Sequence, residues 1–218
     1  TEYSVTSPEI SGYTVDKATV SGSMPAQDVI VTVTYTKRSD LSYTVNYYWN
    51  GTTEKVQASK NVDGQTFNAS VTESPVTIKG YTPVSEAAKT ITIGVENNVI
   101  NFYYYKDVEL TANSKTETFD NTEKSVSGFT GAPEDADFTA ITVGAKGTSA
   151  GEYPAKFPEG TVGTVDATKK YIVVEANPGA LVITAHADEV VVMIRGKSDT
   201  KVYDGKEYTV TGYDVLIN

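Results

Sequence analysis

The chain has 218 residues, of which 18 are basic and 28 acidic, giving a net charge of −10, and it contains no cysteine. This charge argues against nucleic acid as a partner, because binding a polyanion draws its free energy from Lys and Arg side chains. The missing thiols exclude disulfides and thiolate metal sites. The 15 tyrosines and many Thr and Val residues predict an all-β class with minor helix, since such side chains favour strands.

An internal repeat organises the N-terminal half. Residues 6–37 and 73–106 each carry a Ser-Pro pair, a Gly-Tyr-Thr step and an alternating strand closed by a lysine. The offsets are 67 (74 − 7), 68 (80 − 12) and 69 (106 − 37), and a period of this size predicts an array of small modules. The paired positions are Ser7-Pro8 with Ser74-Pro75, Gly12-Tyr13 with Gly80-Tyr81, Val31, Val33 and Tyr35 with Ile100, Phe102 and Tyr104, and Lys37 with Lys106.

Residues 1–39 are interpreted as the C-terminal half of one module. The segment Val29 to Tyr35 alternates apolar with other side chains, which predicts a strand with one buried face. This half lacks a counterpart of the strand that opens the next module. Because an isolated strand pair buries little apolar surface, we expect this end to be marginally stable.

Residues 40–107 are interpreted as a complete module. The alternation from Tyr43 to Trp49 predicts a strand, and Asn50-Gly51 after it favours a tight hairpin into a strand over 53–59. Asp63-Gly64 predicts a further turn, and Asn97-Asn98 precedes the last strand.

Residues 108–189 form a module of another type. Its opening, residues 112–129, recurs without a gap as residues 196–213, at an offset of 84 (198 − 114), so that residues 190–218 begin a second copy. Asn121 stands where that copy has Gly205, a difference in turn chemistry. Further on, Asn177-Pro178-Gly179 predicts a turn between paired strands over 170–175 and 180–185.

The joints between the modules are short polar dipeptides, so each module contacts only its neighbours in sequence, and we expect an elongated monomer. Stability should reside in residues 40–107 and 108–189, with both ends weaker. The joints are Ser39-Asp40, Lys106-Asp107 and Asp188-Glu189.

At these residues the chain resembles the repeat regions of cell-wall-anchored proteins from Gram-positive bacteria. Residues 1–107, with SPEISGYT, VTVTYTK, YTVNYYWNG and INFYYYK, resemble MucBP and internalin-type B repeats, which are small β-grasp-like modules. The remainder, with FDNTEKSVSGF and VYDGKEYTVTGY, is similar to YDG-type MBG repeats. The resemblance implies no catalytic residues and no cofactor.

The function that this resemblance implies is that of a non-enzymatic stalk or adhesive array in a secreted or cell-wall-anchored surface protein. Two alternatives remain open. One is a receptor module for host mucin, other glycans or surface proteins, and the other is an accessory region of a secreted glycan-degrading enzyme. No apolar run approaches the roughly 18–20 residues of a membrane span, so we expect no membrane insertion.

Three tyrosines are the candidate ligand-binding residues. Tyr48, Tyr103 and Tyr105 fall on the opposite strand faces from Tyr47 and Tyr104, and they would gather if the first and last strands of module 40–107 are neighbours. A sugar-stacking platform is one interpretation. Burial under a helix or a module joint is the other.

Other polar groups give weaker signals for chemistry. His186 is the single histidine, which excludes a His-rich metal site, and it is interpreted as a surface or joint residue at a strand end. The acidic run over 134–137 supplies oxygens but lacks the spacing of a calcium loop, so it is interpreted as a solvated loop.

Overall fold

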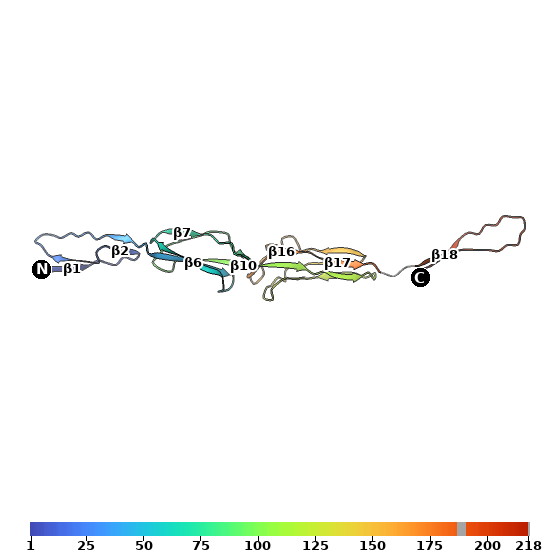
Figure 1. The fold of residues 1–218 in the computed structure, drawn as a ribbon, viewed down its shortest axis with the longest axis horizontal. Helices are drawn as coiled ribbons and strands as arrows, with labels where there is room; N and C mark the ends of the chain where they lie inside the picture. The colour runs from blue at the N-terminus through green and yellow to red at the C-terminus, as the bar shows by residue number, and fades with distance from the viewer. Residues whose placement is uncertain (187–190, 218) are drawn as a thin grey trace.

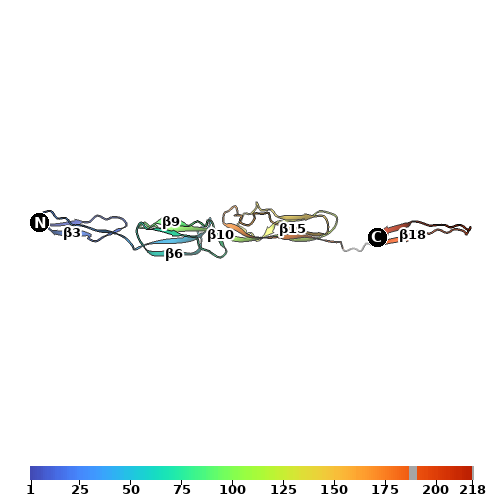
Figure 2. The same ribbon diagram turned by 90° about the horizontal axis from the view of Figure 1, so that it is seen from above.

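The computed structural model describes residues 1–186 and 191–217, and these consist of β-strands and connecting loops. The all-β class predicted from composition is confirmed, and the minor helical component is absent from the described residues. Figures 1 and 2 show residues 1–186 as a long body that is narrow in both views, with the small sheets following one another in chain order. The predicted joint at Asp188-Glu189 lies outside the described residues.

The first unit has two antiparallel strand pairs. One pair is β1 (Glu2–Thr6) with β3 (Thr19–Ser23), and the other is β2 (Tyr13–Val15) with β4 (Tyr35–Lys37). The strand predicted over residues 29–35 is wrong in extent, because only Tyr35 falls within β4. Among the described residues, no strand pairs with residues 28–33 to complete a hydrogen-bonded ladder, and Thr34 is joined to Asp16 by a single backbone hydrogen bond.

The backbone of this unit repeats that of residues 70–106, where β7 (Ser70–Glu73) pairs with β9 (Lys89–Thr92) and β8 (Tyr81–Pro83) pairs with β10 (Val99–Ala112). Tyr35 Oη donates to the Pro8 carbonyl (2.6 Å), as Tyr104 Oη donates to that of Val76 (3.0 Å). Pro8 therefore corresponds to Val76, one residue away from the alignment that the Ser-Pro pairs predict. Gly12 (φ 81°) and Gly80 (φ 79°) make the same left-handed turn in the two copies.

The central module is built on three adjacent strands in the order β6-β5-β10. The predicted hairpin at Asn50-Gly51 joins β5 (Leu41–Trp49) to β6 (Lys55–Gln65), and β5 pairs parallel with β10. Asp63-Gly64 lies inside β6, so the turn predicted there is wrong. Tyr43 of β5 pairs with Val62 of β6, and Leu41 pairs with Gln65, so β6 has one more residue than β5 between these two pairs. This extra residue is a β-bulge, and Gly64 within it has a positive φ of 70°.

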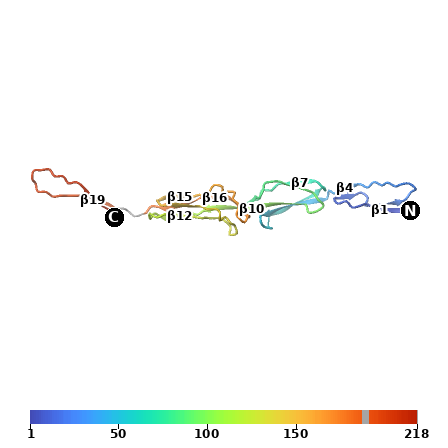
Figure 3. The ribbon, with the colours of Figure 1, turned by 180° about the vertical axis from the view of Figure 1, so that it is seen from behind.

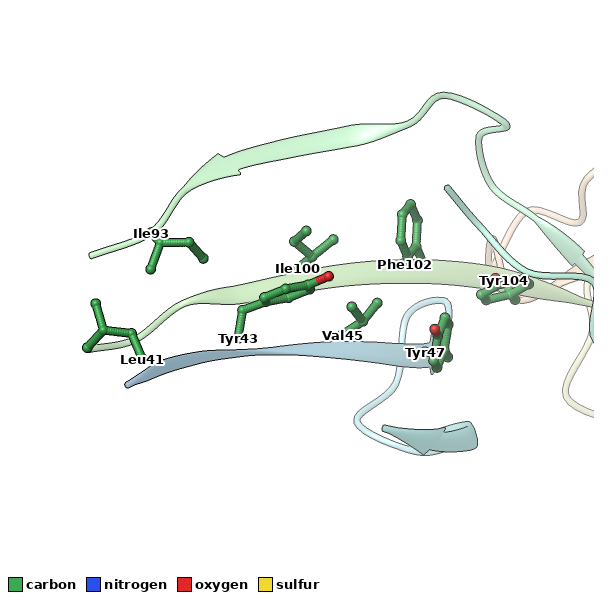
Figure 4. Packing of buried hydrophobic residues seen from close by; sticks show 8 residues of the cluster. All are labelled: Leu41, Tyr43, Val45, Tyr47, Ile93, Ile100, Phe102 and Tyr104. Atoms are coloured by element: carbon green, nitrogen blue, oxygen red, sulfur yellow. The ribbon is translucent and has the colours of Figure 1, made fainter. Parts of the chain in front are cut away.

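The core of this module lies on one face of β5 and β10. Alternate residues of the two strands point into it, and Figure 4 shows their side chains facing the segment that carries Ile93. All of them are at most 7% exposed, so each contributes on the order of 1.5–3 kcal/mol through burial. They are Leu41, Tyr43, Val45 and Tyr47 from β5, Ile93, and Ile100, Phe102 and Tyr104 from β10.

Strand β10 continues from this core into the next one. Its first half pairs with β5, and its second half pairs parallel with β16 (Tyr171–Asn177) and antiparallel with β13 (Phe129–Thr130). Val108 and Leu110 of β10 are buried against Tyr171 and Val173 of β16. The remaining strands of this module are β11 (Lys115–Thr118), β12 (Lys124–Ser127), β14 (Gly144–Gly147), β15 (Gly151–Ala155) and β17 (Gly179–Thr184).

The strands predicted around Asn177-Pro178-Gly179 are present, but they do not pair with each other. β16 runs parallel to β10, and β17 runs parallel to β11, so the chain continues in one direction past Pro178. A Cβ at Gly179 would lie 2.4 Å from the Asn113 carbonyl oxygen, which shows how closely the two backbones pass. The segment is a break between two sheets and not a hairpin turn.

The last described segment repeats the start of module 108–189. β18 (Val192–Gly196) pairs with β19 (Tyr213–Ile217), and Gly196 faces Tyr213 as Ala112 faces Phe129, again 84 residues apart (196 − 112). Figure 3 shows this two-stranded segment from behind. Asn121 (φ 63°) and Gly205 (φ 80°) are both left-handed, so the sequence difference preserves the turn.

Candidate functional site

Two of the three candidate tyrosines meet on the outer face of the central sheet. Tyr48 of β5 is in register with Tyr103 of β10, and their rings stack with centroids 5.9 Å apart at 28°. Parallel pairing of the two strands puts these side chains on the same face, opposite the core. Tyr103 is 40% exposed, so the aromatic pair is accessible from solvent.

Amide groups continue this face beside the aromatic pair. Asn46 Nδ2 donates to Asn101 Oδ1 (3.0 Å), and Asn46 Oδ1 accepts a hydrogen bond from Ser59 Oγ (2.7 Å). Asn46 is only 8% exposed, and these bonds compensate for its burial. These hydrogen bonds connect β5, β6 and β10 beside the two rings.

Two lysines flank the rings. Lys55 Nζ lies 6.0 Å from the Tyr48 ring centroid, and Lys89 Nζ lies 5.7 Å from that of Tyr103. Both distances are within reach of cation–π attraction. A shallow groove of about 460 Å³ passes Lys89, Asn101 and Tyr103. Stacked rings, neutral amides and cations on one exposed face form a surface suited to sugar rings or anionic groups.

By alternation along β10, Tyr105 lies on the same strand face as Tyr103, but its ring is not part of the stacked pair. It pairs with Thr82 of β8 on the following part of β10, and within the described residues it makes no ring contact with Tyr48 or Tyr103. The candidate platform therefore has two tyrosines. The alternative of burial under a helix does not apply to it, because residues 1–186 and 191–217 contain no helix.

The junction between modules 40–107 and 108–189 is a second organised site, which the sequence analysis did not predict. Trp49 at the end of β5 packs edge-on against Tyr171 at the start of β16, with centroids 5.5 Å apart at 72°. Trp49 Nε1 donates to the Lys170 carbonyl (2.9 Å), and the ammonium groups of Lys106 and Lys170 each lie 5.8 Å from the indole. The only available signal was the position of the single tryptophan at a predicted strand end.

The acidic run over 134–137 closes the same junction and is not simply solvated. Asp135 accepts hydrogen bonds from Tyr171 Oη (2.5 Å) and Lys170 Nζ (3.1 Å). Burial, followed by the hydrogen bond to Asp135, raises the pKa of Tyr171 to about 12. Asp137 accepts the backbone amide of Thr139 (3.1 Å). Within the described residues, no group of three potential metal ligands is found.

His186 follows β17 and is exposed. No helix in the described part of the chain has the length and apolar character needed to cross a bilayer.

A family model matches part of the chain. Residues 1–39 match the Muc B2-like domain, which supports a repeat of the MucBP type in that segment. No curated protein matches the chain. The matched segment contains β1 to β4.

Proposed function

We propose that this chain is a non-enzymatic repeat region of a bacterial surface protein, secreted or anchored to the cell wall, in which the modules act as a stalk or adhesive array. The observation that carries the proposal is β10, a single strand of 14 residues that belongs to the cores of two successive modules. A strand shared in this way cannot bend at the joint without breaking ladder hydrogen bonds on both sides.

The contacts around Trp49 add to the stiffness of this joint. Its indole hydrogen bond, its contact with Tyr171 and the hydrogen bond from Asn50 Nδ2 to the Lys169 carbonyl (2.7 Å) all connect the β5–β6 turn to the loop before β16. A stiff joint serves a spacer that holds a terminal domain at a distance from a surface. A flexible linker would not do so.

Small-angle scattering on the whole chain tests the stalk. We expect a rod-like distance distribution for the wild type, and a shorter maximum dimension for Trp49→Ala because the joint becomes able to bend. Trp49→Phe keeps the ring contact and removes only the indole hydrogen bond, so it should behave like the wild type or lie between the two. A compact wild-type particle would contradict the proposal, as would hydrolysis of mucin by the purified chain.

A second candidate function is recognition of mucin or another glycan by Tyr48 and Tyr103. It is supported by the stacked rings of these two residues, of which Tyr103 is 40% exposed, beside the Asn46–Asn101 amide pair. The Muc B2-like match covers residues 1–39 and not this platform. The platform is specific to the central module, because Thr34 occupies the position equivalent to Tyr103 in the first unit.

Binding to a glycan array and to immobilised mucin tests this candidate. Replacing either Tyr48 or Tyr103 by Ala should weaken binding by up to about tenfold, which corresponds to the loss of about 1.4 kcal/mol, near the upper end for one aromatic contact. Tyr105→Ala is the matched control, because that ring lies on the same face but is not part of the stacked pair. If neither glycan nor mucin binds, the chain is a spacer without this receptor function.

A further inference from the structure

Residues 1–37 reproduce the scaffold of residues 70–106 without the β5–β6 hairpin that fills its core. In place of the hairpin there is a groove of about 750 Å³. Apolar side chains from β1, β3 and the segment 29–33 line it, namely Tyr3, Val5, Val20, Val29, Val31 and Val33.

Residues 28–33, which border the groove, have the alternating side chains of a strand but no paired strand along this edge. Val31 and Val33 occupy the positions of Ile100 and Phe102, which are each 2% exposed in the central module, whereas Val31 is 39% exposed. Ile30, which points away from the groove, is 93% exposed. In the central module, residues 99–104 pair parallel with β5, but the corresponding edge of residues 28–33 has no strand partner among the described residues.

We propose that this groove is an acceptor site for a β-hairpin of the β5–β6 type, supplied by the same polypeptide ahead of Thr1, whose first strand adds parallel to residues 30–35. The added strand would satisfy the backbone groups of the open edge, and its alternate side chains would fill the groove. The inference goes beyond the proposed function, since it holds for a stalk and for a receptor alike.

The source of the hairpin follows from the order of the central module. There, only residues 66–69 separate β6 from β7, so the equivalent hairpin leads directly into β1. A second copy could donate its own β5–β6 only by removing Leu41, Val45 and Tyr47 from a core in which each is at most 4% exposed. That exchange exposes as much apolar surface as it buries.

The groove also specifies one residue of its occupant. In the central module, Tyr43 Oη donates to Glu73 Oε1 (2.6 Å), and Glu73 pairs with Lys89. Val5, paired with Val20, occupies the place of Glu73 in the first unit. A tyrosine hydroxyl would have no carboxylate to meet there, so the hairpin that fits the groove has an apolar residue at the position of Tyr43.

In the test, a second copy of residues 40–68 is fused to the N-terminus of the chain, directly ahead of Thr1. This copy carries Tyr43→Phe. The fusion point is Thr1 because Thr1 occupies the position that Ala69 has after β6 in the central module. Hydrogen exchange of the extended chain should then show the backbone amides of residues 30–35 slowed by at least about tenfold relative to the unextended chain. The amides of β5 in the intact central module serve as the folding control. A fused copy that retains Tyr43 should slow the exchange of these amides less than the copy with Phe at that position.

Two acceptor variants give matched controls. Val31→Lys places a charge in the groove and should abolish the added protection, whereas Ile30→Lys lies on the outer face and should leave it. Unchanged exchange in the extended chain, with the central module intact, would overturn the proposal. The proposal would also be overturned if the amides of residues 30–35 became protected in the unextended chain as it dimerised at higher concentration. A second copy of the chain would then be the occupant of the groove.

Discussion

Asp166 shows how one buried carboxylate organises the loop that leads into β16. It is 2% exposed, and its Oδ1 accepts the backbone amides of Lys170 and Tyr171, each at 2.8 Å. Its Oδ2 accepts the amide and the hydroxyl of Thr168. Burial raises the pKa of this carboxyl, but the hydrogen bonds lower it more, so the net pKa lies below its ordinary value. The ionised form is therefore part of the folded structure.

We predict that Asp166→Asn lowers the free energy of unfolding by about 1–3 kcal/mol at neutral pH, because one acceptor oxygen becomes a donor facing backbone amides. A carboxyl with a lowered folded-state pKa stabilises the fold above its unfolded pKa of about 3.9 and loses this effect as the pH falls through the folded pKa. The difference in free energy of unfolding between Asp166→Asn and the wild type should therefore become smaller below about pH 4. Urea unfolding across the pH range measures it.

The exposed Asp63 provides the control for this prediction, since Asp63→Asn changes the same chemical group on the surface of β6. We expect it to leave the free energy of unfolding within about 0.5 kcal/mol of the wild type. A difference for Asp166→Asn that stays constant from pH 7 to pH 3 would show that its ionisation does not contribute to stability.

At the scale of the element, β10 couples the two central modules. The Lys106 amide donates to the Lys170 carbonyl (2.9 Å), and the next amide, that of Asp107, donates to the Gly80 carbonyl (3.0 Å). Neighbouring residues of one strand are thus bonded to loops of different modules. Unfolding of either module disrupts the strand on which the other depends, so we expect residues 41–184 to unfold in one transition.

Lys106→Pro should split that transition into two, because proline has no amide hydrogen to donate at the joint and interrupts the ladder there. Differential scanning calorimetry measures the number of transitions. Lys106→Ala retains the amide and removes only the ammonium group beside Trp49, so it should keep a single transition. Two transitions in the wild type would mean that the shared strand does not couple the modules.

The same scale shows where local patterns predict strands and where they fail. Alternation identified β5 and the last strand of the central module, since side-chain period is a property of the segment itself. Asp63 and Gly64 are typical turn residues, yet they form a bulge inside β6, because β5 pairs with β6 both before and after them. Asn177-Pro178-Gly179 likewise becomes a break between β16 and β17, because each strand has a parallel partner elsewhere.

At the scale of the whole molecule, the two ends differ in how they are held. The first unit contacts the central module through Tyr13 and Phe67, whose rings are 5.7 Å apart, and through the hydrogen bond from the Phe67 amide to the Arg38 carbonyl (2.8 Å). β18 and β19 pair with each other, and all their residues are exposed. The sequence predicts only that both ends are weaker than residues 40–107 and 108–189.

Limited proteolysis followed by mass spectrometry should therefore cut in a definite order. We predict the first cleavages within residues 197–212, which carry no strand, and slower ones within residues 24–34 along the open groove. Residues 41–184 should persist longest, since they contain the buried clusters. Early cleavage within residues 41–184 would contradict this order.

The sequence by itself determined the strand-rich class, the two internal repeats and the hairpin at Asn50-Gly51, because alternation, turn residues and gapless self-similarity are local properties of the chain. The 84-residue repeat reappears in the pairing of β18 with β19, and the pairing of Tyr48 with Tyr103 needed only the assumption that the first and last strands are neighbours. Only the tertiary structure decided that Trp49 contacts Tyr171 and that the Tyr105 ring is not part of the stacked pair. Such contacts join residues more than 100 positions apart, and their closeness depends on which strands pair, a choice made by the burial of whole faces and not by any short segment.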